Sequence, residues 1–322
     1  MQKLRSWMIA TIFSLATLGV GPVHADDYPT RSIKVIVAYA VGSGADTIAR
    51  ILGEQLAINL NTPVVIENIA GAGGAKGTVA AARAASDGHT LLLAPTTLTV
   101  SAHMEAKPQY DPIKDFAPIM RVAILPLVLV VGPQMPFQTL GELIREAKKN
   151  PGKLNYATSG KGTGSHLEVE LFARQMGIEV TEVPYKTGSQ ALTDVISGQV
   201  SFYLPVIPAA GQQILAGRMN ALAIGTRQRS TEFPNIPTFA EALNIPDYEA
   251  SVWYGLLAPA GTNNQIIQKL AAELSKILEM QKIKDKIAAT GSEVSPLNAK
   301  EFSAFIQAES KKWGDLVKTL GL

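Results

Sequence analysis

The chain contains 322 residues, of which 47% are hydrophobic and 17% are charged, and it has no cysteine. This composition is typical of a folded globular protein, and the lack of thiols excludes disulfides, cysteine-ligated metal clusters and cysteine nucleophiles. Lys3 and Arg5 lie in a predicted leader without acidic residues, so the rest of the chain carries 27 basic and 27 acidic side chains. Such a balance lacks the basic surface that nucleic-acid binding requires, and it favours small-molecule partners.

Residues 1–25 have the pattern of a cleavable secretory signal peptide. Lys3 and Arg5 precede an apolar stretch at residues 7–20, and Val23-His24-Ala25 forms a cleavage site with small residues. The apolar stretch is shorter than the roughly 20 residues that a membrane-spanning helix needs. We therefore expect cleavage after Ala25 and a periplasmic protein.

After the leader, short apolar strands alternate with helices. Strands are predicted at residues 33–39, 64–66 and 91–93, with one helix around residues 49–56 and another at 78–85. This βαβαβ order predicts a parallel sheet.

A polar link at residues 111–116 leads through a strand at 117–124 into a second series of the same kind. Its strands are predicted at residues 127–131, 154–157, 179–183, 200–204 and 221–224, and its helices at 140–149, 165–176 and 190–197. An apolar stretch at 251–257 and helices at 265–279 and 299–317 complete the chain, and we expect these terminal helices to cover the first sheet.

About 297 residues remain after the leader, which is more than one hydrophobic core usually serves. We predict an α/β protein of two lobes, the first formed by residues 26–122 together with 251–322 and the second by residues 123–250. Two strands, near residues 118–124 and 248–257, would join the lobes. Two connections of this kind make a hinge over a cleft.

A glycine-rich turn follows the first strand, where Val41, Gly42, Ser43 and Gly44 lead into the first helix. Such a turn presents helix N-terminal N–H groups, backed by the positive end of the helix dipole, and therefore suits an anion. Two other interpretations compete. Gly42 and Gly44 start a dinucleotide fingerprint, but Thr47 occupies its third glycine position and Asp46 would repel a pyrophosphate. The glycines could also merely turn the chain, with Asp46 as a helix cap.

A second turn of the same kind precedes the helix predicted at residues 165–176. It runs through Ser159, Gly160, Lys161, Gly162, Thr163, Gly164, Ser165 and His166. A third candidate lies at residues 185–189. Two helix N-termini, one from each lobe, could hold one anionic ligand between them.

Residues for other chemistry are sparse. His89, His103 and His166 are the only histidines after the leader, and none stands at metal-binding spacing to another, so no metal site is expected. Neither Ser159 nor Ser165 lies in a nucleophile elbow. A catalytic His166 stays open as an alternative, although no acid or nucleophile beside it completes such a site.

Many ordered blocks of the sequence resemble the Bug family, the periplasmic substrate-binding proteins of tripartite tricarboxylate transporters. They include Gly42 to Arg50, Glu67-Asn68, Asp87-Gly88-His89-Thr90, Lys114-Asp115-Phe116-Ala117-Pro118, Pro151-Gly152-Lys153-Leu154, Val183-Pro184-Tyr185-Lys186, Pro234-Asn235-Ile236-Pro237-Thr238 and Trp253-Tyr254-Gly255-Leu256-Leu257. The resemblance covers nearly the whole chain after the leader.

The resemblance implies a type II periplasmic binding fold whose cleft holds a carboxylated solute, without cofactor or catalysis. It places the carboxylate between the two turns, on Val41, Gly42, Ser43, Gly44 and Asp46 from one lobe and Ser159, Gly162, Thr163, Gly164, Ser165 and His166 from the other. It also implies delivery to membrane permease subunits. A monomer is the simplest expectation.

Two departures from the family pattern bear on the ligand. Ala38, Tyr39 and Ala40 stand where relatives commonly have prolines and a phenylalanine. Tyr203 and Pro205 lie where many relatives carry an aspartate near the far end of the ligand, and the lack of this acid argues against an amino acid. This far wall is then without an acid, and Tyr39, Tyr203, Trp253 and Tyr254 could supply aromatic surface, so the hypothesis is a dicarboxylate, for example terephthalate. Trp253 and Tyr254 could equally belong to hinge or core packing. A carboxylate sensor that docks on a kinase and a cleft hydrolase are the alternatives.

Overall fold

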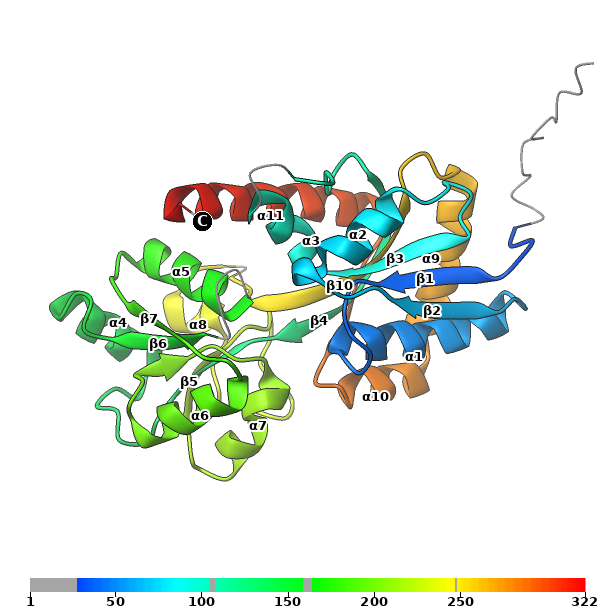
Figure 1. Cartoon of the computed structure of the whole chain (residues 1–322). Coiled ribbons are helices and arrows are strands. Elements are labelled where there is room, and N and C mark those ends of the chain that lie inside the picture. Colours follow the sequence, from blue (N-terminus) through cyan, green and yellow to red (C-terminus); the bar gives the residue numbers. More distant parts are fainter. Residues whose placement is uncertain (1–27, 105–107, 159–163, 247, 322) are drawn as a thin grey trace, which may run out of the picture.

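The computed structural model describes residues 28–104, 108–158, 164–246 and 248–321, and these form two α/β lobes, each with its own central sheet (Figure 1). The predicted signal peptide lies outside the described residues. Within the described part of the chain, no helix is both long and apolar enough to cross a membrane.

The first sheet has six strands in the order β11-β4-β10-β3-β1-β2. Its parallel part consists of β1 (Ile33–Val37), β2 (Val64–Asn68) and β3 (Thr90–Pro95), as the βαβαβ order predicts. The other strands, which pair antiparallel, are β10 (Ser251–Pro259), β4 (Phe116–Pro126) and β11 (Glu293–Leu297). β10 runs against β3 because the chain re-enters this sheet from the other lobe.

Helices cover both faces of the first sheet, and alternate residues of β1 show this directly. Val35 and Val37 pack in the core beneath one helix group, whereas Ile36 packs in the core on the opposite face. The first group comprises α1 (Gly44–Asn59), α9 (Asn264–Glu279) and α10 (Gln281–Ala288). The second comprises α2 (Ala75–Ala82), α3 (Thr97–Met104) and α11 (Ala299–Leu320), with the short helix η2 (Ala72–Gly74) before α2. The two terminal helices thus both pack on this sheet.

The second sheet has five strands in the order β7-β6-β8-β5-β9. They are β5 (Val128–Val131), β6 (Asn155–Thr158), β7 (Thr181–Pro184), β8 (Phe202–Tyr203) and β9 (Asn220–Ile224). α4 (Leu140–Lys149), α5 (Gly164–Met176) and α8 (Phe239–Leu243) cover one face, and α6 (Gly188–Ser197) and α7 (Ile207–Leu215) cover the other. As in the first sheet, a parallel trio, β7-β6-β8, is extended by antiparallel strands.

Three chain segments meet between the two sheets. β4 continues through Leu127 into β5, and Leu127 N–H donates to the carbonyl of Ala250, 3.0 Å away, just before β10. Gly225 N–H donates to Leu127 at 2.8 Å, and Ala250 N–H donates to Gly225 at 3.1 Å. We call Leu127, Gly225 and Ala250 the junction. β4 runs unbroken through residues 122 and 123, so the lobe boundaries drawn from the sequence stay a prediction.

Several element bounds differ from the sequence-based expectation. β1 ends at Val37, because the chain then leaves the sheet to form the turn before α1. α2 starts at Ala75 instead of residue 78, after Gly74 at φ 97°, and β8 keeps only Phe202 and Tyr203. The elements that the prediction missed are α3, α7, α8, α10 and β11. α3 contains three β-branched residues, Thr97, Thr99 and Val100, and such residues favour strands.

Candidate functional site

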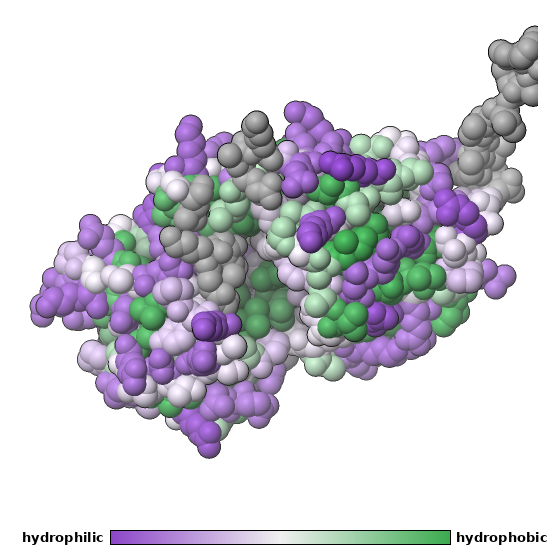
Figure 2. Space-filling model, viewed as in Figure 1, coloured by the Kyte–Doolittle hydropathy of each residue, from purple (hydrophilic) through white to green (hydrophobic). Residues whose placement is uncertain are grey.

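A cavity of about 260 Å³ lies between the lobes, in the hollow of Figure 2 where apolar surface is exposed. The first lobe contributes Tyr39, Ser43, Gly44, Ala45, Pro95, Thr96, Thr97, Val100 and Trp313 to its wall. The second lobe contributes Gly164, Leu167 and Glu168 of α5, and Ser251, Val252 and Tyr254 lie on β10, which joins the lobes. Ligand pockets commonly measure roughly 300 to 1,000 Å³, and a cavity slightly below this range suits a small solute.

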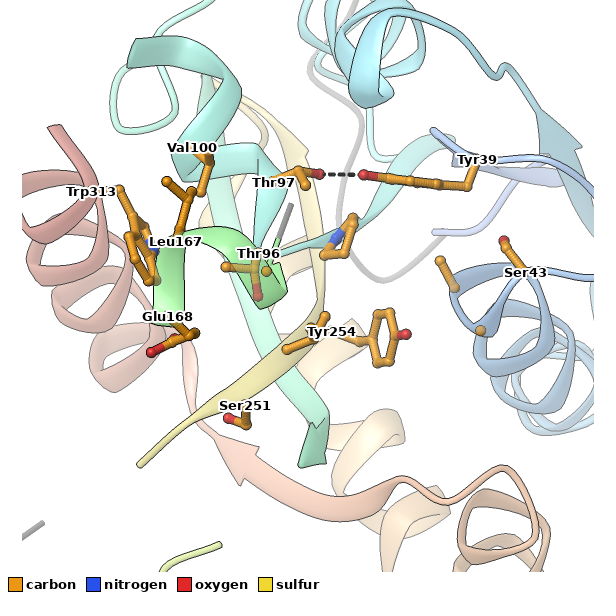
Figure 3. Close-up of a pocket in the computed structure, with 15 residues that line it drawn as sticks. Tyr39, Ser43, Thr96, Thr97, Val100, Leu167, Glu168, Ser251, Tyr254 and Trp313 are labelled. Atoms are coloured by element: carbon orange, nitrogen blue, oxygen red, sulfur yellow. Dashed lines mark hydrogen bonds between the residues drawn. The ribbon is translucent and has the colours of Figure 1, made fainter. Parts of the chain in front are cut away.

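The N-terminus of α1 forms one end of this cavity (Figure 3). Ser43 caps the helix, because its hydroxyl accepts a hydrogen bond from Asp46 N–H at 3.3 Å. Gly44 packs closely on Tyr254, because a Cβ atom there would lie 2.6 Å from the tyrosine hydroxyl, and a larger residue would have to displace this ring. The turn thus brings helix N-terminal backbone close to the cavity, and helix N-termini in general stabilise anions.

The buried carboxylate of Asp46 stabilises this turn. Its carboxylate accepts hydrogen bonds from Gly42 N–H at 2.9 Å, Arg50 Nε at 3.0 Å and Asn68 Nδ2 at 3.0 Å. Burial opposes its ionisation, but these hydrogen bonds outweigh burial and lower the pKa of Asp46. The N–H of Gly42 is therefore committed within the turn, and we propose that Asp46 positions the turn.

Tyr39 connects the turn to α3. Its hydroxyl lies 2.7 Å from Thr97 Oγ1 and donates to the carbonyl of Gly73 at 3.2 Å (Figure 3). Burial raises the pKa of Tyr39, so the phenol stays neutral. Nearby, Gly77 packs against β1 so closely that a Cβ atom would lie 2.7 Å from Ala38 Cα. The glycine-rich segment at residues 71–78 thus lets α2 pack closely on the sheet.

α5 supplies the opposite wall of the cavity. Gly164 begins this helix, and Leu167 and Glu168 follow one turn later on the same side. Of the predicted anion-binding turn, Ser159, Gly162 and Thr163 lie outside the described residues. Ser165 and His166 are buried and do not line the cavity, and His166 Nε2 lies 3.9 Å from a carboxylate oxygen of Glu182.

The comparisons with known proteins agree over most of the chain. Residues 48–322 match the model of the tripartite tricarboxylate transporter family receptor, TctC. Protein BugT of Bordetella pertussis is 36% identical over 324 residues, which cover 100% of this chain and 99% of BugT. This chain belongs to the TctC family. It is a periplasmic solute-binding protein of the TctC/Bug type.

Solved structures of TctC-type proteins have the same fold. A periplasmic transporter with 37% identity covers 90% of this chain and 97% of its own, with a TM-score of 0.72. Rpa4515 of R. palustris, solved with adipate, has 29% identity and a TM-score of 0.73, and covers 92% of this chain and 99% of its own. MatC of Rhodopseudomonas palustris, with bound malate, has 30% identity and a TM-score of 0.70, and covers 90% and 100%. These relatives are binding proteins rather than enzymes.

Not every residue predicted for the TctC site lies at the cavity. Tyr39, Ser43, Gly44 and Gly164 come together there. Val41 is 72% exposed at the tip of the turn. Tyr203 and Pro205 are buried in the second lobe, where the carbonyl of Pro205 accepts from Val128 N–H at 2.9 Å. A ligand contact by these three residues stays a prediction.

Two premises about the ligand end of the TctC cavity need correction. The expectation of a wall without acidic groups is wrong, because Glu168 lines the cavity. The ligand-facing interpretation of Trp253 does not hold either, and the alternative of core packing does, since this ring packs edge-to-face on Phe302 and Phe305. The spacing from Gly164 to Glu168, one helical turn, was the signal in the sequence that could have placed this acid. No local signal points to Thr96, Val252 or Trp313, which only tertiary packing brings to the cavity.

No group of three or more histidine, aspartate or glutamate side chains in the described ranges could hold a metal ion. Among the described residues, the cavity wall carries one carboxyl group, that of Glu168, beside several hydroxyl side chains.

Proposed function

We propose that this protein captures a small organic carboxylate in the interlobe cavity and delivers it to the membrane permease subunits of a tripartite tricarboxylate transporter. The observation that carries the proposal is the position of the α1 N-terminus, with its capping Ser43 and closely packed Gly44, at the cavity wall. An oriented helix end of this kind favours a carboxylate over a neutral group. Family membership supports the transport role.

The rest of the cavity suits the carbon frame of such a ligand. Apolar side chains of Val100, Leu167, Val252 and Trp313 line it, together with the ring of Tyr254. We propose a dicarboxylate as ligand, and an aromatic one such as terephthalate is a candidate because Tyr254 and Trp313 offer ring surface. The structures of Rpa4515 with adipate and MatC with malate support the dicarboxylate class.

Tryptophan fluorescence offers a direct test of the ligand class. The sequence contains three tryptophans, of which Trp7 lies in the predicted leader, whereas Trp313 lines the cavity. We expect malate, adipate or terephthalate to change the emission saturably at micromolar concentrations, and glucose to have no effect. Trp313→Phe should remove most of the signal, and Trp253→Phe should keep it. Preference for glucose or for an amino acid such as glutamate would contradict the proposal.

The two turns can be tested together. If Ser43 and Thr163 both donate to the ligand carboxylate, the variant with both residues changed to alanine should bind the preferred dicarboxylate more weakly by about 1 to 3 kcal/mol. Ser43→Ala alone also removes the cap of α1, which costs about 1 kcal/mol of stability. Thermal unfolding of each variant separates this loss from the loss of affinity, and an unchanged dissociation constant would place the carboxylate elsewhere.

A further inference from the structure

The C-terminal helix α11 belongs to the first lobe but also contacts the second. It packs on β4 and α3, and its later turns reach α5 across the interlobe gap (Figure 1). Trp313 and Leu316 of α11 share a small apolar cluster with Leu167 of α5 and Val100 of α3. Any opening or closing of the lobes would therefore change the contact between α5 and α11.

A second cavity of about 250 Å³ lies beside this contact. Its charged lining comprises Glu168 of α5, Glu309 and Lys312 of α11, Arg227 shortly after β9 and Glu249 just before β10. Tyr248, Ser251 and Trp253 also line it. Glu168 and Ser251 line both this cavity and the proposed ligand cavity, so the side chain of Glu168 lies where the two cavities adjoin.

The charges around the second cavity are unevenly paired. Lys312 Nζ lies 2.5 Å from Glu309 but 4.0 Å from Glu168. Glu309 also accepts hydrogen bonds from the indoles of Trp313 at 2.9 Å and Trp253 at 3.3 Å. Glu168, which is 3% exposed, has one carboxylate oxygen, Oε2, without a hydrogen-bond partner in the described chain.

Two arginine side chains near this cavity, Arg227 and Arg121, pair with Glu249. Arg227 Nε lies 3.0 Å from that carboxylate, and Arg121 Nη1 lies 4.0 Å from it. Glu168 is therefore the carboxylate of this cluster that has no cation closer than 4.0 Å. A buried carboxylate in this position is costly when ionised and much less so when protonated.

We propose that Glu168 is a proton-dependent latch between the lobes. α5 stays packed on α11 while the carboxyl group of Glu168 holds its proton, and the contact loosens when the group ionises. The latch thereby sets how readily the lobes close. Only its consequence for ligand capture rests on the proposed function.

The titration of Glu168 gives the direction and the pH range. Burial raises its pKa to about 7; Lys312 opposes this, and Glu309 and Glu249 add to it. When the lobes separate, water reaches the carboxyl group and its pKa returns toward the ordinary value near 4.3. Since the closed contact has the higher pKa, the closed-to-open ratio falls as pH rises from about 4.3 to about 7, by at most about tenfold per pH unit, and levels off above that range.

The distance between the lobes in the ligand-free protein measures this directly. The chain has no cysteine, so Ile58→Cys on α1 and Leu215→Cys on α7, both highly exposed positions, allow specific labelling of one site in each lobe. Spin-label distance distributions between pH 4 and 8.5 should shift toward longer distances as pH rises, with a midpoint between the two pKa values of about 4.3 and 7. Glu168→Gln, which resembles the protonated acid, should keep the shorter distances over the whole range.

Two further variants sharpen the test. Glu309→Gln frees Lys312 to pair with Glu168 and should move the midpoint to lower pH. Asp315→Asn changes an exposed acid on the same helix and should leave the midpoint in place. A pH-independent distance in the parent protein, or a transition that persists in Glu168→Gln, would overturn the latch.

A titration with malate and adipate keeps the two proposals apart. If the latch operates on capture, the dissociation constant of the bound dicarboxylate should rise several-fold from pH 6 to pH 8 in the parent and stay constant in Glu168→Gln. If neither dicarboxylate binds but the distance shift occurs, the latch holds and the carboxylate proposal fails. If a dicarboxylate binds with the same pH dependence in both proteins, the latch fails and the carboxylate proposal holds.

Discussion

Replacing Gly225 by alanine is expected to lower the free energy of unfolding by about 3 kcal/mol. Gly225 belongs to the junction, and a Cβ atom there would lie 1.8 Å from the carbonyl oxygen of Ala250. The obstacle is backbone that is itself hydrogen-bonded to Leu127 and Gly225, so relieving the clash must disturb the connection between the sheets. Urea denaturation followed by far-ultraviolet circular dichroism measures the loss.

Gly141→Ala provides the matched control. Gly141 lies in the first turn of α4, and the nearest atom to a new Cβ there is Arg145 Nη1, 3.6 Å away at the end of a flexible side chain. Alanine should therefore fit, and stability should rise by about 0.5 to 1 kcal/mol because alanine restricts the unfolded chain. Equal stability of the two variants would show that the junction tolerates a side chain.

Replacing Asp46 by alanine should lower the free energy of unfolding by about 2 to 3 kcal/mol and weaken dicarboxylate binding at least tenfold. The substitution leaves Gly42 N–H and Asn68 Nδ2 without their acceptor and removes the ion pair with Arg50, whose Nη2 lies 2.9 Å from the carboxylate. Because these groups hold the turn at the cavity wall, both folding and ligand affinity depend on them. Urea denaturation and fluorescence titration with malate or adipate measure the two effects.

The pH dependence of this variant gives a separate check. The pKa of Asp46 is lowered in the folded protein, so its stabilisation is present above its ordinary pKa near 3.9 and is lost as pH falls below that value. The difference in stability between the parent and Asp46→Ala should accordingly shrink toward pH 3. Asp285→Ala, an exposed position on α10, should change stability by less than about 0.5 kcal/mol at any pH. A constant difference for Asp46→Ala would mean that its charge does not hold the turn.

The elements predicted best are those whose signals are local. The helix predicted at residues 140–149 is α4 itself, because Thr139 and Glu142 form a capping box and apolar residues recur at helical spacing. The order of parallel strands around β1 and around β6 likewise follows from alternating patterns. α10 and β11 escaped prediction, since short amphipathic segments gain their structure from packing on neighbours that lie far away in the chain.

The candidate site divides in the same way. Tyr39, Ser43, Gly44 and Gly164 were predictable, because glycine and hydroxyl residues mark where a strand passes into a helix. Trp313 of α11 and Val252 of β10 lie far from α5 in the sequence and meet it only in the folded chain. Glu168 stands between these cases. Its helical spacing from Gly164 was readable, but its burial and its distant cation were not.

The reach of α11 across the lobes has a practical side for anyone building a biosensor from this protein. A surface tether attached beyond Leu320 would pull on a helix that contacts α5, and would therefore act on the contact that we propose as the latch between the lobes. Immobilisation through the exposed face of α4, on the opposite side of the second sheet from α6, would place no force on α11. A sensor attached through α4 should report the solute concentration, whereas the signal of one attached beyond Leu320 would also depend on the force of its attachment.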